Sequence, residues 1–509
     1  MPDEEGPYFE RTDTLDFIQR VAGQKSLVIY VGAGVSIDRT GLQWEHLISK
    51  LMAKKVDNKE LRGRLLSDNP LQSASIAKQL YINDAENLAK ANIQISREVQ
   101  SCLYTGEWRR SDIARSIMLL VAELKAQGTR VHIITTNYDD CLEHELKLLN
   151  NARGQRNEKP IRLTKCVPRQ VSFDRIDQEV DRVVREEHII HLHGYVPEPG
   201  GRPTSITLSE VDYAMSYPLS SKILERLFQN NAVLILGSSL TDPPLLNALA
   251  TTTSRSTDKR PRFAVMPVQG FGLPIALHRD IRENVASRMD HFKVEVTFPD
   301  HFSEVAQLVT EIRIRAKQGR TNVPFGDSDD CLGSRLRTWW EGWAQVREGR
   351  WADANKEDHR LLKKCEDELT HELRKAVRNA EVEIWVRWRP DGNGTQLRLW
   401  ASSKATWPDV DARTAKVGNG SAYLVSVEAF TLGRVEFYPP DESAEQRRRW
   451  YLCVPIRAGE VQHSELLTAI ISFAYQLENG DHTKDLAVMH RMKVVGLLES
   501  YGRQIIDVN

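Results

Sequence analysis

Residues 25–36 read KSLVIYVGAGVS, a compact apolar run that ends in a glycine-rich turn. Short, β-branched runs without polar alternation are typical of strands that are buried on both faces of a sheet. Such runs recur, with helical patterns between several of them, at VHIIT (131–135), HIIHL (188–192), AVLIL (232–236), RFAVMP (262–267) and HFKVEVTFP (291–299). Apolar strands that alternate with helices predict an α/β domain with a Rossmann-like parallel sheet between two layers of helices.

We predict that this domain occupies residues 1–317, because a helical pattern at 302–317 follows the last candidate strand. A stretch at about 56–110 contains no convincing strand and is interpreted as a helical insertion, which could act as a lid. QGRTNVPFGDSDD (318–330) is rich in turn-forming residues and lacks periodicity, so it is the predicted linker. Residues 331–509 are expected to form a smaller α+β domain.

The composition is that of an ordinary globular protein and restricts the classes of partner. The chain of 509 residues has 69 Lys and Arg against 70 Asp and Glu, which gives no indication of nucleic acid or an anionic membrane as a partner. It contains no apolar run of the ~18 residues that a membrane span requires. The acidic first residues lack the features of a signal peptide. We therefore expect a cytoplasmic protein.

The six cysteines are too far apart in sequence to form a CxxC pair. This spacing disfavours a zinc ribbon and a dense disulfide framework. We expect free thiols in a reducing compartment and no bound zinc.

Four polar or glycine-rich segments follow predicted strands, where ligands bind in open α/β sheets. The first is GAGVS (32–36), whose glycines would let the backbone approach a pyrophosphate at the N-terminus of the next helix. The others are TTNYD (135–139), HLHG (191–194) and GSSLTD (237–242). Each alone also fits a simpler role, because GxG is common at strand–helix turns and Asn137 or Asp242 could cap a helix. His191 could be an interior histidine, and strand alternation places it on the same face as His193.

Taken together, GAGVS, TTNYD, HLHG and LGSSLTD resemble the sirtuin family over about residues 15–315. They resemble most the bacterial sirtuin-like NADases of antiphage defence, such as the Thoeris effector. This resemblance implies that Asn137 lies beside the nicotinamide ribose and that His193 is the catalytic base. It also implies an NAD-binding set of Gly32, Ala33, Gly34, Ser36, Thr136, Asp139, Gly237, Ser238, Ser239 and Asp242.

Two departures from the protein-deacylating sirtuins favour the defence branch. The chain has no quartet of zinc-binding cysteines, and TGLQWEHL (40–47) stands where those enzymes have GIPDFR. The resemblance therefore implies an NAD+ hydrolase that releases nicotinamide and ADP-ribose as an abortive-infection effector, with NAD+ as its substrate. A protein deacylase or ADP-ribosyltransferase, and a non-catalytic NAD-binding regulatory module, are the alternatives.

Beyond residue 330, three segments resemble a GAF domain, with an unrelated α+β module as the alternative. They are VGNGSAYLVSVEAFTLG (417–433), RWYLCVPIRAG (449–459) and LLTAIISFAY (466–475). We expect this domain to control the activity of the enzyme by sensing a signal molecule or by binding a partner protein. We also expect a homo-oligomer. Trp339, Trp340 and Trp343 lie at helical spacing, which fits packing within this domain or a contact that transmits the gate.

Overall fold

The computed structural model describes residues 7–66, 69–104, 111–255, 260–271, 277–319, 331–373, 377–388, 395–405, 413–417, 424–440, 449–458, 466–477 and 491–507. The chain forms two compact units. One spans Arg20–Phe298, and the other joins Met1–Gln19 to Pro299–Asn509.

The first unit is built on a seven-stranded sheet in which every neighbouring pair is parallel. The strand order is β3-β4-β2-β1-β5-β6-β7. The strands are β1 (Ser26–Val31), β2 (Arg130–Thr135), β3 (Thr164–Cys166), β4 (His188–His191), β5 (Ala232–Leu236), β6 (Arg262–Val265) and β7 (Val294–Thr297). The predicted Rossmann-like sheet is confirmed. β3 was not predicted, because its three residues are too few to show a pattern and include two exposed side chains.

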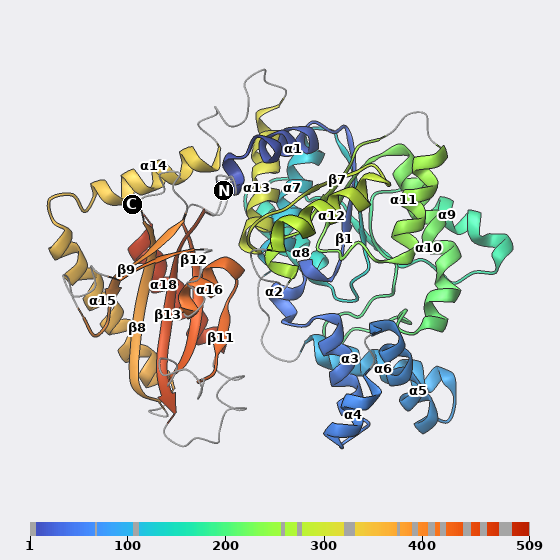
Figure 1. Ribbon diagram of the computed structural model, residues 1–509, viewed down its shortest axis with the longest axis horizontal. Helices are drawn as coiled ribbons and strands as arrows, with labels where there is room; N and C mark the ends of the chain where they lie inside the picture. The colour runs from blue at the N-terminus through green and yellow to red at the C-terminus, as the bar shows by residue number, and fades with distance from the viewer. Residues whose placement is uncertain are drawn as a thin grey trace. The chain divides into compact units, whose positions relative to one another are not determined.

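Helices cover the sheet on both faces (Figure 1). On one face, α9 (Ile176–Val184), α10 (Glu210–Asn230) and α11 (Pro243–Arg255) share an apolar core with β1, β4 and β5. On the other, α7 (Asp112–Ala126) packs against β2 and α8 (Cys141–Gln155). Shorter or peripheral elements are η2 (Ala33–Val35), α2 (Ile37–Thr40), η3 (Phe173–Arg175), η4 (Val268–Phe271) and α12 (His278–Asp290).

The predicted insertion is helical where it is described, and Figure 1 shows it as a bundle set apart from the sheet. It contains α4 (Lys59–Leu65), α5 (Pro70–Asp84) and α6 (Leu88–Leu103), which join α3 (Trp44–Ala53). Asn58, Asn69 and Asn87 begin its helices by accepting backbone N–H bonds as N-caps. Its core also takes in Tyr138 and Val196, so the bundle packs on the loops that follow β2 and β4.

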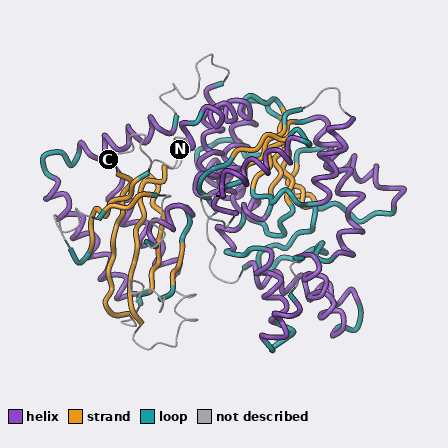
Figure 2. The backbone as a smooth tube through the Cα atoms, in the orientation of Figure 1, coloured by secondary structure: helices purple, strands orange, loops and turns teal. Residues whose placement is uncertain are grey.

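The second unit contains a six-stranded antiparallel sheet, visible in Figure 2, with the order β10-β9-β8-β13-β12-β11. Its strands are β8 (Val377–Trp388), β9 (Gln396–Ser402), β10 (Thr414–Lys416), β11 (Glu436–Tyr438), β12 (Trp450–Ala458) and β13 (Leu466–Leu477). One core joins this sheet to α14 (Leu332–Gln345), α15 (Trp351–Glu372) and α18 (Arg491–Ile506). A second core lies beneath α16 (Val425–Leu432). The predicted smaller α+β domain is therefore present.

The tryptophans at the start of this unit pack within it. The indole Nε1 of Trp343 donates to the carbonyl of Ile505 at 3.0 Å, and that of Trp339 donates to Ile506 at 3.4 Å. Both side chains are buried in the core between α14 and the sheet. They thus satisfy carbonyls at the end of α18 that lack a partner within that helix.

The division between the units differs from the predicted boundary. It falls before α13 (Ser303–Gln318), which had been predicted as the last helix of the first domain. The helix groups with the second unit because Glu311 pairs with Arg335, and because Gly433 lies so close that a Cβ there would be 2.6 Å from Ser303. The same unit holds η1 (Tyr8–Glu10) and most of α1 (Thr12–Ala22). Residues 320–330 of the predicted linker lie outside the described residues. No described helix has the length and apolar character needed to cross a membrane.

Candidate active site

Four strand ends meet along one edge of the parallel sheet. Backbone bonds continue from strand to strand beyond their regular ends: Leu192 N donates to Thr135 O at 2.9 Å, Thr136 N to Val31 O at 3.1 Å, and Gly32 N to Leu236 O at 2.9 Å. These bonds join the HLHG, TTNYD, GAGVS and GSSLTD segments in the order of their strands. The sheet therefore brings together all four segments that the sequence singled out.

The glycines hold two of these loops in direct backbone contact. Gly34 N donates to Gly237 O at 2.9 Å. A Cβ on Gly32 would lie 2.5 Å from that same oxygen, and Gly237 has a φ of +64°, which favours glycine. Close packing of loop on loop thus accounts for these glycines, and their contact with a nucleotide stays a prediction. The predicted helix after GAGVS is only the single turn of α2, so its dipole adds little to anion binding.

The Asn137 side chain is held by its amide nitrogen. Nδ2 donates to Gly32 O at 3.0 Å and to Ser36 Oγ at 2.8 Å, and Ser36 Oγ donates in turn to Asp139 Oδ1 at 3.0 Å. Asp139 also accepts from Cys141 N at the start of α8. Within the described part of the chain, Asn137 Oδ1 has no hydrogen-bond partner. This oxygen is the atom of Asn137 that can receive a hydrogen bond from a ligand.

His191 has partners at both ring nitrogens and is 0% exposed. Nε2 lies 2.7 Å from Glu143 Oε1, and Nδ1 lies 3.2 Å from the carbonyl oxygen of Asn137. Burial lowers the pKa of His191, but the Glu143 carboxylate outweighs burial, and the net pKa is raised. Because both neighbours are acceptors, the imidazolium form satisfies both. His191 therefore anchors the backbone of Asn137 and has no nitrogen free to take a proton.

His193 differs from His191 in having one free nitrogen. Its Nε2 lies 3.4 Å from Asp242 Oδ1, whereas its buried Nδ1 has no partner among the described residues. The Tyr213 ring packs against the imidazole at 4.9 Å between centroids. β4 ends at His191, so His193 lies in the turn beyond it and strand alternation no longer relates the two side chains. The structure thus distinguishes two histidines that the sequence could not.

The remaining NAD-binding candidates lie on the same loops. Ala33 is exposed beside Gly34, and Thr136 is half-buried after β2. Ser238 Oγ accepts from Leu240 N, and the exposed Ser239 hydroxyl lies 2.6 Å from Thr241 Oγ1. Asp242 faces inward: besides His193, its carboxylate accepts from Tyr30 Oη at 3.1 Å and from Leu245 N at 3.3 Å. The helix-capping role considered for Asp242 is therefore present.

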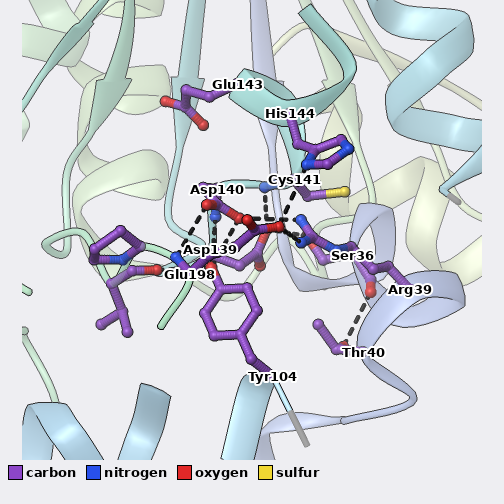
Figure 3. A network of polar contacts seen from close by, with 12 residues as sticks. Ser36, Arg39, Thr40, Tyr104, Asp139, Asp140, Cys141, Glu143, His144 and Glu198 are labelled. Atoms are coloured by element: carbon purple, nitrogen blue, oxygen red, sulfur yellow. Dashed lines mark hydrogen bonds and ion pairs between the residues drawn. The ribbon is translucent and has the colours of Figure 1, made fainter. Parts of the chain in front are cut away.

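A second polar network, drawn in Figure 3, lies beside this group and was not predicted from the sequence. Arg39 is almost fully buried and pairs with Asp140 at 3.1 Å and Glu198 at 3.0 Å. The Tyr104 hydroxyl, at the end of α6, lies 2.8 Å from Asp140 Oδ1. Adjacent carboxylates thus serve different partners, since Asp139 holds Ser36 while Asp140 holds Arg39 and the helical insertion. The charged residues next to GAGVS and TTNYD were the only sequence signal for this network.

No group of three or more His, Cys, Asp or Glu side chains in the described ranges could hold a metal ion. All six cysteines are free thiols, and five of them are buried.

Comparisons with known proteins find a partial family match and several similar solved structures. The family model of the SIR2-like domain matches residues 131–285. Similar solved structures include one from work on the mechanism and regulation of Sir2 enzymes, 14% identical with a TM-score of 0.30, over 60% of this chain and 98% of that chain. Another is a complex of a Sir2 homologue with NAD, 12% identical with a TM-score of 0.28, over 60% and 93% of the two chains. No curated protein matches.

Proposed function

We propose that this protein is an NAD+ glycohydrolase that cleaves the nicotinamide–ribose bond to release nicotinamide and ADP-ribose. The observation that carries the proposal is that two acceptor atoms, Asn137 Oδ1 and His193 Nδ1, belong to adjoining strand-end loops and have no hydrogen-bond partner among the described residues. The match of residues 131–285 to the SIR2-like domain supports NAD+ as the substrate.

The chemistry requires little acid catalysis. The bond between C1′ of the ribose and the pyridinium nitrogen breaks, its electron pair goes to that nitrogen, and nicotinamide leaves as a neutral molecule. The ribose passes through an oxocarbenium-like transition state, as in other glycosidic cleavages. A water oxygen bonds to C1′ and gives up a proton, which His193 accepts as general base before passing it to solvent. Asn137 Oδ1 would orient the water or a ribose hydroxyl.

Product analysis tests the proposal directly. The full-length protein is incubated with NAD+, with and without lysate from phage-infected cells, and nicotinamide and ADP-ribose are quantified. Hydrolysis predicts equal amounts of the two products. Release of nicotinamide with transfer of the ADP-ribose group to protein would favour an ADP-ribosyltransferase. Nicotinamide release that depends on an acylated peptide would favour a deacylase. Saturable NAD+ binding without any nicotinamide would favour the regulatory module.

Asn137→Ala and His193→Ala serve as inactive variants, and His46→Ala is the matched control. His46 is an exposed histidine on α3, so its removal should leave turnover unchanged. Turnover near that of the wild type in either site variant would contradict the assignment.

We also propose that the enzyme acts in the bacterial cytoplasm as a homo-oligomeric antiphage effector, gated by its C-terminal unit or by a partner. An NADase without a gate would deplete its own cell, and the second unit has its own sheet and cores in which a sensor could be built. Cells that express the protein should lose NAD+ after phage infection, and cells that express His193→Ala should not. Constant NAD+ in infected cells would contradict the defence role.

A further inference from the structure

Tyr30, Asp242 and His193 form a connected polar group from three separate parts of the first unit. Tyr30 lies in β1, Asp242 lies just before α11, and His193 lies in the turn after β4. The hydroxyl of Tyr30 donates to Asp242 Oδ2 at 3.1 Å, and Asp242 Oδ1 lies 3.4 Å from His193 Nε2. Tyr30 and His193 are buried.

The chemistry of these atoms determines where the imidazole proton lies. An ionised carboxylate only accepts hydrogen bonds, so a bond between Asp242 and His193 requires the hydrogen on Nε2. Tyr30 and Leu245 N both donate to Oδ2, which leaves Oδ1 for the histidine. Burial, and then the nearby Asp242 charge, raise the pKa of Tyr30, which keeps its hydroxyl protonated as a donor.

We propose that Asp242 and Tyr30 are positioning residues that hold the neutral Nε2–H tautomer of His193 and thereby make Nδ1 the base. This inference rests on the proposed hydrolase function. Nδ1 is buried and lacks a partner among the described residues, which is unusual for a buried polar atom and fits one that awaits a proton from a ligand. Asp242 also stabilises the imidazolium that forms when Nδ1 takes the proton from water or a ribose hydroxyl. Under this proposal Asp242 positions His193. The resemblance to sirtuins had instead implied that Asp242 binds the nucleotide.

His191 provides an internal contrast. It also pairs with a carboxylate, that of Glu143, but its second nitrogen is occupied by the Asn137 carbonyl. Two histidines two residues apart thus have the same kind of partner on Nε2 and differ in whether Nδ1 is free. The proposal therefore makes the Asp242–His193 pair, and not the Glu143–His191 pair, the proton-accepting unit.

The test variant is Asp242→Asn in the full-length protein, because asparagine is nearly isosteric and caps helices as well as aspartate does. The cap on Leu245 N is thus retained while the carboxylate is removed. The matched control is Asp177→Asn, which removes an exposed carboxylate from the first turn of α9. We expect Asp242→Asn to lower kcat for nicotinamide release at least tenfold with KM within threefold, and Asp177→Asn to change neither.

Tyr30→Phe should lower kcat about threefold, and the double variant should be no slower than Asp242→Asn alone, because Tyr30 acts only through Asp242. A raised KM with unchanged kcat in Asp242→Asn would instead make Asp242 a nucleotide contact and overturn the proposal. Additive losses of kcat in the double variant would likewise contradict the proposal that Tyr30 acts through Asp242.

Nitrogen NMR of the full-length protein labelled with 15N-histidine tests the tautomer without turnover. The signals lost in His193→Gln identify the residue, and we expect a protonated Nε2 and an unprotonated Nδ1 at pH 8. A proton on Nδ1 would overturn the proposed tautomer of His193, whether or not the protein releases nicotinamide. If the Nε2–H tautomer is found but no nicotinamide is released, the proposed hydrolase function fails and the Asp242–His193 pairing stands.

Discussion

Glu143→Gln should change how the stability of the protein depends on pH. In the wild type the raised pKa of His191 means that the folded protein binds this proton more tightly than the unfolded chain, in which the histidine pKa is ~6.5. The resulting stabilisation is complete below pH ~6.5 and is lost as the pH rises through the folded pKa. In the variant His191 stays buried without a carboxylate, and burial then favours its neutral form. The contribution of His191 to stability therefore reverses its sign.

The expected magnitude follows from the geometry. Removing one partner of a buried pair costs 3–5 kcal/mol as an order of magnitude, and less here because the Glu143 side chain is 21% exposed and glutamine can still bond to the neutral ring. We expect Glu143→Gln to be about 2 kcal/mol less stable than the wild type at pH 6. Above pH ~6.5 this difference should shrink by at most about 1.4 kcal/mol per pH unit.

Urea unfolding of both proteins at pH 6, 7 and 8 measures this difference. The control is Glu60→Gln, whose pair with Arg64 is about three-quarters exposed on both sides. It should cost less than about 0.5 kcal/mol at every pH. A Glu143→Gln difference that stays constant or grows with pH would refute the assignment of a charged, buried His191.

Three further predictions concern the site. Asn137→Ala and His193→Ala should each abolish nicotinamide release without unfolding the protein, and His191→Ala should lower turnover less. A larger loss of turnover in His191→Ala than in His193→Ala would move the role of the base to His191. Gly237→Ala should destabilise by roughly 2 kcal/mol or more in urea unfolding, because a Cβ at this positive φ would lie 2.6 Å from Val35 N; a change below the error of the measurement would show that the loops can separate. The purified protein should carry no stoichiometric zinc; one zinc per chain by elemental analysis would revive the deacylase alternative.

The sequence alone was sufficient to predict the parallel sheet and the four polar segments that follow its strands. Buried strands have a local signature, because each must be apolar on both faces over a few consecutive residues. The runs at 25–31, 131–135 and 232–236 match β1, β2 and β5 to within a residue. The edge strand β3 escaped detection because an exposed three-residue strand has no such signature.

Only the tertiary structure determined what each polar side chain contacts. His191 and His193 have similar local sequence settings, yet one bonds to Glu143 and the other to Asp242. The Arg39 network likewise joins residues about 100 and 159 positions apart in the chain. The division between the two units also depends on the long-range packing of α13. The composition of the predicted linker gave no indication of this packing. Secondary structure reflects the residues that are near in sequence, whereas hydrogen-bond partners and protonation are set by groups that only the folded chain brings together.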